Sequence, residues 1–237
     1  MAEQQQYAAD YGPDHVQLNI IMSIPAENPA AYPPKKTALM LLDFHQLIVD
    51  MIQPQNTRER LCSDIQRLLK AARVNGSPVV HAMIDFDEEP LPKSKIRPNF
   101  AAKYKPLLSS TPEKFVEWEG FTNDAAPTSH EITVSKTPGC VSALKTPELL
   151  DFLKYKHGIE SLIICGVVTS GAVLSTAREA ADLGFVTTVV EDGCWDYTPE
   201  AHEVVLRKVL PMTAWVTTTE TALKLLDGIA EPLENTT

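Results

Sequence analysis

The sequence has no surplus of basic residues. Its 237 residues include 31 acidic and 21 basic side chains, which gives a formal net charge of −10. Nucleic acids and anionic membrane surfaces are bound through basic faces, so we expect neither as a partner. A small anionic substrate remains compatible with this composition, because the charge within one pocket can oppose the charge of the whole chain.

Long hydrophobic runs are also absent. No apolar run approaches the ~18 residues that a membrane span requires. The first residues, Met1–His15, contain no basic region followed by an apolar one, as a secretory signal would. The sequence therefore predicts a cytoplasmic protein that spans no membrane.

Cysteines are few and show no pairing pattern. No two of them form a CxxC pair, and no Cys/His cluster has the spacing of zinc ligands. Asp85 and Asp87 follow a predicted strand without histidine partners. We therefore expect reduced thiols, no catalytic metal and no cofactor. The four cysteines are Cys62, Cys140, Cys165 and Cys194.

What the chain does contain, from residue 37 onward, is an alternation of apolar, β-branched strands with amphipathic helices. The predicted strands are residues 37–43, 77–85, 130–136, 160–168, 185–192 and 213–218. The predicted helices are residues 56–74, 146–157, 171–183 and 220–228, with a further one beginning at Thr198-Pro199. Apolar strands of this kind, alternating with helices, indicate an α/β fold with a six-stranded parallel sheet covered on both faces.

Two segments stand outside this alternation. Residues 1–36 are polar and then rich in Pro and Ala, which indicates an N-terminal arm whose Val16–Ile24 forms an edge strand or packs on a partner subunit. Residues 86–130 carry six prolines and interrupt the domain spanning residues 37–230. Because structureless loops of that length are uncommon, we predict an insertion with short helices that acts as a lid.

Three points far apart in the sequence should meet at one edge of the sheet, because parallel strands with right-handed crossovers end on the same side. Asp43 ends the first strand, where it is either a cap or a carboxylate facing a ligand. Lys136 ends the third strand, where it either reaches solvent or pairs with Asp43. The third point is the strand-to-helix elbow within Ile163–Thr176, whose free N–H groups suit a polarised oxygen and whose most exposed side chain, Ala172, is inert.

These segments together resemble the isochorismatase-like (cysteine hydrolase) superfamily. The similar stretches read LLDFHQ, TVSK and GVVTSGAVLSTAREAADLGFVTTVVEDGCWD, and the resemblance runs from residue 37 to residue 222. It implies a Rossmann-like three-layer sandwich and a homo-oligomer, dimer or tetramer. It also implies a hydrolase of small carbonyl, amide or enol-ether compounds.

The resemblance also assigns roles to residues. It implies that Asp43 is the base, that Lys136 is its partner and that the Val167–Val168 peptide bond is cis. The backbone N–H groups of Val168 and Ala172 would form an oxyanion hole. Ala172 stands where the amidohydrolases of the family carry their nucleophilic cysteine, and no thioester forms on alanine.

Three hypotheses for Ala172 stay open. The cysteine was replaced by mutagenesis, or the chain belongs to a natural branch that uses Asp/Lys acid-base chemistry without a thiol, or the site only binds small molecules. Two further residues differ from the family pattern. His45 stands where the family has a Gln or Asn. Met83–Asp85 lacks a glutamine that isochorismatases have, which makes isochorismate a weaker candidate for the substrate.

Further side chains are candidates for the pocket. Thr169 follows the predicted cis bond, and His45 faces either the pocket or, by a small preference, the solvent. Trp195 and Trp118 are expected pocket walls, subunit contacts or core residues. Cys140 and Cys194 are expected in loops at the pocket rim, where a loop cysteine usually has no chemical role.

Overall fold

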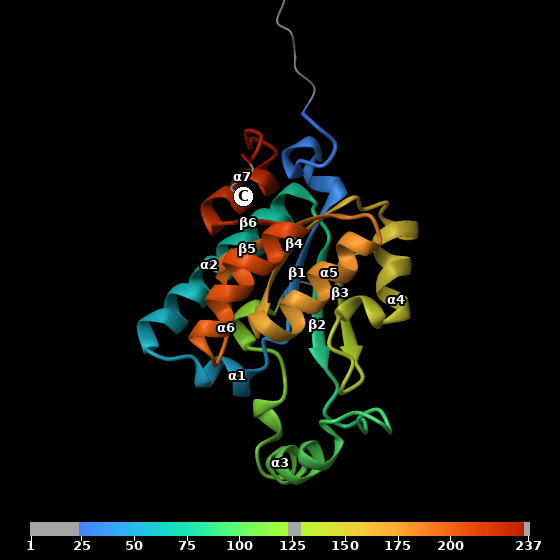
Figure 1. Ribbon diagram of the computed structural model, residues 1–237, viewed down its shortest axis with the longest axis vertical. Coiled ribbons are helices and arrows are strands. Elements are labelled where there is room, and N and C mark those ends of the chain that lie inside the picture. The colour runs from blue at the N-terminus through green and yellow to red at the C-terminus, as the bar shows by residue number, and fades with distance from the viewer. Residues whose placement is uncertain (1–23, 123–128, 235–237) are drawn as a thin grey trace, which may run out of the picture.

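Six parallel strands form one sheet in the order β3-β2-β1-β4-β5-β6 (Figure 1). The computed structural model describes residues 24–122 and 129–234. The strands are β1 (Thr37–Leu42), β2 (Val79–Ile84), β3 (Glu131–Lys136), β4 (Ser161–Val167), β5 (Val186–Trp195) and β6 (Trp215–Thr217). This topology confirms the predicted α/β sheet, in which every strand ends at the same edge.

Helices cover both faces of the sheet. The α-helices are α1 (Gln46–Met51), α2 (Gln55–Asn75), α3 (Arg97–Ser110), α4 (Pro147–Leu150), α5 (Leu174–Asp182), α6 (Pro199–Val204) and α7 (Thr219–Asp227). Short 3-10 and π-helical turns are η1 (Pro29–Ala31), η2 (Pro34–Lys36), η3 (Pro112–Lys114), η4 (Glu119–Phe121), η5 (Ala143–Lys145), η6 (Asp151–Lys156), η7 (Thr169–Val173), η8 (Val205–Val209) and η9 (Leu210–Met212). Among the residues described, none of the helices is both long and apolar enough to cross a bilayer.

Strand β1 shows how the two cores form. Every residue of β1 is buried. Because successive side chains of a strand point to opposite faces, Leu39 and Leu41 pack with α2 and α7, whereas Met40 and Leu42 pack with α5 and the helix formed by α4 and η6. Figure 1 shows these two helical layers on either side of the sheet.

The expected segment boundaries were wrong at the end of the fifth strand. We predicted that this strand ends at Asp192 and that Cys194 lies in the loop beyond it. The pairing with β4 shifts register between Ile164 and Gly166, and Gly166 then pairs with Cys194. This irregularity lets β5 continue to Trp195 and places Cys194 inside the sheet, where its side chain is buried.

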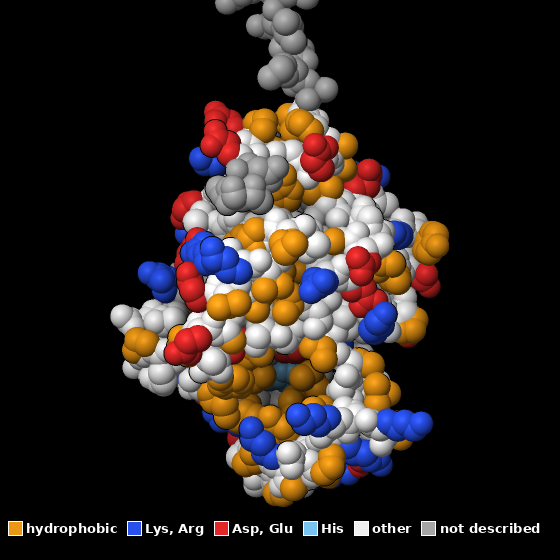
Figure 2. Space-filling view, viewed as in Figure 1, with side chains coloured by type: hydrophobic (Ala, Val, Ile, Leu, Met, Phe, Trp, Pro, Cys, Tyr) orange, Lys and Arg blue, Asp and Glu red, His pale blue; other side chains and the backbone are white. Residues whose placement is uncertain are grey.

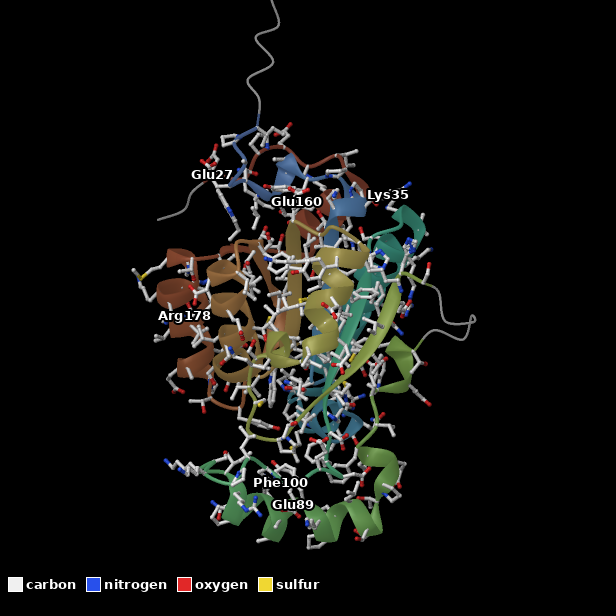
Figure 3. All side chains as sticks on the ribbon, turned by 90° about the vertical axis from the view of Figure 1, so that its right-hand side faces the viewer. Glu27, Lys35, Glu89, Phe100, Glu160 and Arg178 are labelled. Atoms are coloured by element: carbon white, nitrogen blue, oxygen red, sulfur yellow. The ribbon has the colours of Figure 1, made fainter. Side chains whose placement is uncertain are left out.

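The insertion, residues 86–130, contains α3, η3 and η4, as the Pro-rich sequence predicted. Its helix α3 lies beyond the carboxyl ends of the strands (Figure 1), where the insertion has an aromatic core of its own, formed by Phe86, Phe100 and Phe115, whereas η4 packs against α2. Figure 3 shows Phe100 on the side of α3 that faces the sheet, at the opposite end of the molecule from Lys35. Residues 123–128 and most of the expected strand at 16–24 lie outside the described residues.

A buried charge network ties the insertion to the sheet. The His81 Nδ1 atom lies 2.7 Å from Glu117 Oε1 and its Nε2 atom lies 2.9 Å from Glu131 Oε1. Arg73 donates two further hydrogen bonds to Glu131. Because carboxylates only accept hydrogen bonds, both ring nitrogens must carry protons and His81 is a cation. The two carboxylates accordingly raise the pKa of His81 to about 9, against the opposing effect of burial.

This network predicts a pH-dependent stability. The pKa of His81 rises from 6.5 in the unfolded chain to about 9 in the folded protein, so protonated His81 increases the free energy of unfolding. This contribution is complete below pH 6.5 and is lost as the pH rises through 9. We expect His81→Gln to remove about 3 kcal/mol of this stabilisation at pH 6 and far less at pH 10. Urea unfolding across this range measures the difference, and His130→Gln, at an exposed histidine, is the control. A difference between wild type and His81→Gln that stays constant with pH would contradict a charged His81.

Candidate active site

Strand register brings the three predicted points to one edge of the sheet. Leu42 pairs with Gly166 on one side and with Ala82 on the other, and Ile84 pairs with Lys136 on the next strand. Asp43 is therefore held at the end of the central strand, next to the elbow that follows β4. Its φ of 60° is in the left-handed region, which Asp tolerates better than most residues. This is the only non-glycine residue with positive φ among those described.

Asp43 and Lys136 form a buried ion pair. The Lys136 Nζ atom lies 2.6 Å from Asp43 Oδ2, and the Lys136 and Asp43 side chains are 1% and 6% exposed. Lys136 also donates a longer hydrogen bond of 3.4 Å to the carbonyl of Val141. The other carboxylate oxygen, Asp43 Oδ1, is buried and has no hydrogen-bond partner among the described residues. A buried, unpaired carboxylate oxygen is rare in folded proteins, and it leaves one lone-pair position for a substrate or a water molecule.

Burial raises the pKa of Asp43, because desolvation outweighs the opposing attraction of Lys136. A carboxyl group with a raised pKa takes up a proton more readily at moderate pH than an ordinary aspartate does. The pair is thus arranged to hold or release one proton at Asp43 Oδ1 while Lys136 stays bound to Oδ2.

The preference for a solvent-facing His45 was wrong, because this side chain is only 1% exposed. The tight turn at Asp43, closed by the hydrogen bond from the His45 N–H to the Asp43 carbonyl, directs it inward. Its Nε2 atom lies 3.1 Å from the carbonyl of Ile84, and its ring packs edge-on against Phe86 of the insertion. Burial lowers the pKa of His45, which favours a neutral ring.

The elbow after β4 is fixed from two sides. The Val167–Val168 peptide bond is cis, and η7 begins at the next residue. The Thr169 side chain is fully buried, with its hydroxyl 2.8 Å from His202 Nδ1. The Ser170 N–H donates a 2.7 Å hydrogen bond to Asp196. These contacts hold the backbone around Val168 close to the Asp43–Lys136 pair.

Sequence reasoning missed Asp196 and His202. Asp196 also accepts a hydrogen bond from the Thr198 N–H, so in the sequence it looks like an ordinary helix cap. The only signal in the sequence was that Asp196 is the last residue of the stretch that resembles the family. Trp195 itself pairs with Val167 and contacts the ring of Tyr197, whereas Trp118 packs against Phe121 in the core.

Ala172 was expected to be the most exposed side chain of the elbow, but it is buried in the core, and the buried cysteines of β4 and β5 offer no thiolate in its place. Burial raises the pKa of Cys194 to about 12 and also raises the pKa of Cys165, so neither forms a thiolate near neutral pH. The predicted core position of Cys165 is confirmed. Cys140, which is partly exposed, lies in the loop after Lys136 and its Sγ forms no disulfide.

A cavity of about 620 Å³ lies beyond the carboxyl ends of the strands; residues that follow Asp43 and Lys136 line it, but Asp43 and Lys136 themselves do not. Its walls come from the segments that follow β1, β2, β3 and β5, and from α3 of the insertion. Figure 2 shows a hollow above the α3 region, with hydrophobic walls, a rim of basic side chains and a histidine at its floor. Ile84, the hydrogen-bond partner of His45, belongs to the cavity wall. A ligand in this cavity would therefore lie beside the segments that hold Asp43 and Lys136.

The described residues contain no group of three or more His, Cys, Asp and Glu side chains arranged to hold a metal ion. Asp85 does not point to an ion, because its carboxylate accepts the backbone N–H groups of Asp87 and Glu88. The side chains that the structure brings together at this edge of the sheet are the carboxylate of Asp43 and the ammonium group of Lys136.

The sequence matches the family described as isochorismatase domain over residues 37–221. A maleamate amidohydrolase of Pseudomonas putida is 26% identical over 198 residues, which cover 83% of this chain and 89% of that protein. An uncharacterised isochorismatase family protein, YecD, of Escherichia coli O157:H7 is 26% identical over 195 residues, covering 81% and 97% of the two chains.

Solved structures share the fold. An isochorismatase family protein from Burkholderia thailandensis superposes with a TM-score of 0.64 at 20% identity, covering 81% of this chain and 96% of that one. An N-carbamoylsarcosine amidase from Thermoplasma acidophilum superposes with a TM-score of 0.57 at 17% identity, covering 78% and 97%. The resemblance and the fold inferred from the sequence are thus confirmed.

The buried ion pair predicts how its two partners respond to mutation. Lys136→Met leaves the Asp43 carboxylate buried without a counter-charge and should reduce the free energy of unfolding by about 3–5 kcal/mol. Adding Asp43→Asn removes that charge and should restore at least half of the loss. Urea unfolding of the two single variants and the double variant measures the coupling, with Lys35→Met as an exposed control. A double variant no more stable than Lys136→Met would show that the charges are not coupled.

Proposed function

This chain belongs to the isochorismatase family of hydrolases, and we propose that it hydrolyses a small carbonyl, amide or enol-ether compound by acid-base chemistry, without a covalent thiol intermediate. The observation that carries the proposal is the buried Lys136–Asp43 pair, whose free Oδ1 atom lies at the edge of the sheet next to the elbow of Ala172. A carboxylate in this setting can exchange protons with a bound molecule.

We propose the following roles for an amide substrate. Water takes the place of the missing thiol and adds to the carbonyl carbon, while Asp43 Oδ1 accepts a proton from it. The N–H groups of Val168 and Ala172 stabilise the negative charge that forms on the carbonyl oxygen. Asp43 then passes the proton to the leaving nitrogen, which departs as an amine. For an enol ether, the protonated form of Asp43 would instead donate to the double-bond carbon before water adds.

Lys136 has a separate role in this proposal. It keeps Asp43 oriented through Oδ2 and opposes the effect of burial on the carboxyl pKa. Its positive charge also stabilises the ionised state that Asp43 reaches each time it gives up the proton. His45, Thr169 and Trp195 are proposed to shape the substrate site, His45 through the wall residues Ile84 and Phe86 that it contacts.

Ala172 is also compatible with two alternative functions. One is a cysteine amidohydrolase whose nucleophile has been replaced, and the similarity to a maleamate amidohydrolase agrees with it. The second is a protein that binds its ligand without converting it. The intact Asp43–Lys136 pair argues against a purely binding protein, because a site that had lost its reaction would have no need to keep both residues.

Replacing the carboxylate tests the proposed chemistry. Asp43→Asn keeps the size of the side chain but removes the proton acceptor, so kcat should fall by about 10²-fold or more. The substrate is first found by screening the wild-type protein against amides, ureides and enol ethers. Asp87→Asn, which changes an exposed aspartate near the same edge, should leave kcat unchanged. An Asp43→Asn variant with full activity would refute the mechanism.

Restoring a thiol separates the hydrolytic mechanism from the substituted-cysteine alternative. If water is the natural nucleophile, Ala172→Cys fills the space that the water needs and should lower turnover of the substrate found by screening, with no burst of product. A burst followed by faster amide turnover, together with a trapped thioester in mass spectrometry, would show that the site is built for cysteine. Ala180→Cys, at a buried alanine of α5, is the matched control.

A further inference from the structure

The ionisable side chains that line the 620 Å³ cavity include two lysines and no carboxylate. Lys95, Asn99 and Lys103 supply the nitrogen-bearing side chains of its wall, and no Asp or Glu contributes to it. Asn99 and Lys103 lie four residues apart on α3, and Lys95 lies four residues before Asn99. This spacing puts Asn99 and Lys103 on the same face of the helix. Such a basic row is notable in a chain whose net charge is −10.

The two lysines have no counter-charge of their own. The described residues provide neither Lys95 nor Lys103 with an ion-pair partner, and Lys103 Nζ lies only over the ring of Tyr104, 4.9 Å from its centroid. Among the acidic side chains that follow Phe86, Glu89 pairs with Lys105 and Glu88 accepts a hydrogen bond from Thr137. The positive charges of Lys95 and Lys103 are therefore available to a ligand.

The rest of the wall is apolar and partly aromatic. Phe86 and Phe100 stack with their ring centroids 5.6 Å apart, and Tyr104 packs on both of them. Tyr197 and Ile84 close the side towards the sheet. A volume of this size is typical of small-molecule sites, and its aromatic and apolar lining favours a ligand with a flat apolar body over a compact polar one.

The cavity wall includes close neighbours of the ion pair, although neither Asp43 nor Lys136 lines it. Ile84 is the strand partner of Lys136, and Pro138 and Gly139 of the wall follow Lys136 closely. Leu47 and Ile48 of the wall lie in the helix that begins three residues after Asp43. A ligand whose body occupies this cavity would thus extend its reacting group inward and its opposite end towards α3.

We propose that the substrate is an organic anion with an aromatic or similarly flat apolar body, held by the apolar walls of the cavity, with its acidic group facing Lys95 and Lys103 on the insertion. This substrate class rests on the proposed function for its link to catalysis. The recognition itself requires only the cavity and its two lysines. These lysines are then specificity-determining residues, remote from the bond that is broken.

The test uses cinnamate and its neutral counterpart, cinnamyl alcohol, which share the flat body and contain no bond for a hydrolase to cleave. Calorimetry at low salt should show that the wild-type protein binds cinnamate about tenfold more tightly than cinnamyl alcohol, as two exposed lysines would provide. Lys95→Met combined with Lys103→Met should abolish this preference without weakening the binding of cinnamyl alcohol. Asn99→Glu, which adds one negative charge between the two lysines, should reduce the preference without removing it.

Two controls locate the effect. Lys93→Met removes the same charge from an exposed lysine outside the cavity, and should leave the preference intact. Asp43→Asn should also keep it, although catalysis is lost. Equal binding of the two probes to wild-type protein, or an equal loss in Lys93→Met, would overturn the inference while leaving the proposed function standing. Retained anion preference in a protein that turns over none of the screened compounds would instead count against the proposed function alone.

Discussion

The pairing of Asp43 with Lys136 is the interaction on which the rest of the site depends. Burying two charges is unfavourable unless each finds its partner at close range, and these two come from strands that are not neighbours. β1 and β3 are separated by β2, so the lysine reaches across the end of β2 to the carboxylate. This contact needs the three strands to be held in a fixed register, with β1 ending two residues before the end of β2, and parallel pairing provides that register. The sheet therefore fixes the short distance between Lys136 Nζ and Asp43 Oδ2.

Around this pair, the chain supplies support from segments that have no chemistry of their own. The backbone of residues 116–118 lies along the turn after Asp43, with hydrogen bonds from Gln46 to Val116 and from Trp118 to Phe44. Glu117, between them, is held by His81 of β2. The insertion thus does more than cover the cavity. It clamps the turn that carries Asp43 and His45, so that the walls of the substrate site and the position of the carboxylate are fixed by the same contacts.

Much of this arrangement was predictable from sequence because it follows from local patterns. The fully apolar run of β1 ending in Asp43, and the strand ending in Lys136, are enough to place both side chains at one edge once the sheet is parallel. His45 was misplaced because its direction depends on the left-handed backbone of Asp43, which a sequence does not display. The end of β5 was misplaced because a register shift lengthened the strand. In the His81 network, the two glutamates lie 36 and 50 positions after the histidine in the sequence. Contacts over such separations leave no periodic pattern from which they could be predicted.

The absence of a thiol changes what the remaining groups must do. In a thiol hydrolase the carboxylate serves a bound sulfur atom of fixed position, and the covalent intermediate retains the acyl group. In the mechanism that we propose, the nucleophile is a water molecule, whose position depends on the groups around it. Asp43 Oδ1 is the buried oxygen without a hydrogen-bond partner at this edge of the described structure, and Ala172 contributes only a methyl group at the elbow. Since a mobile nucleophile loses the benefit of a fixed geometry, the binding energy of the substrate body must compensate. A large apolar cavity with two unpaired lysines is the part of this molecule that can provide it.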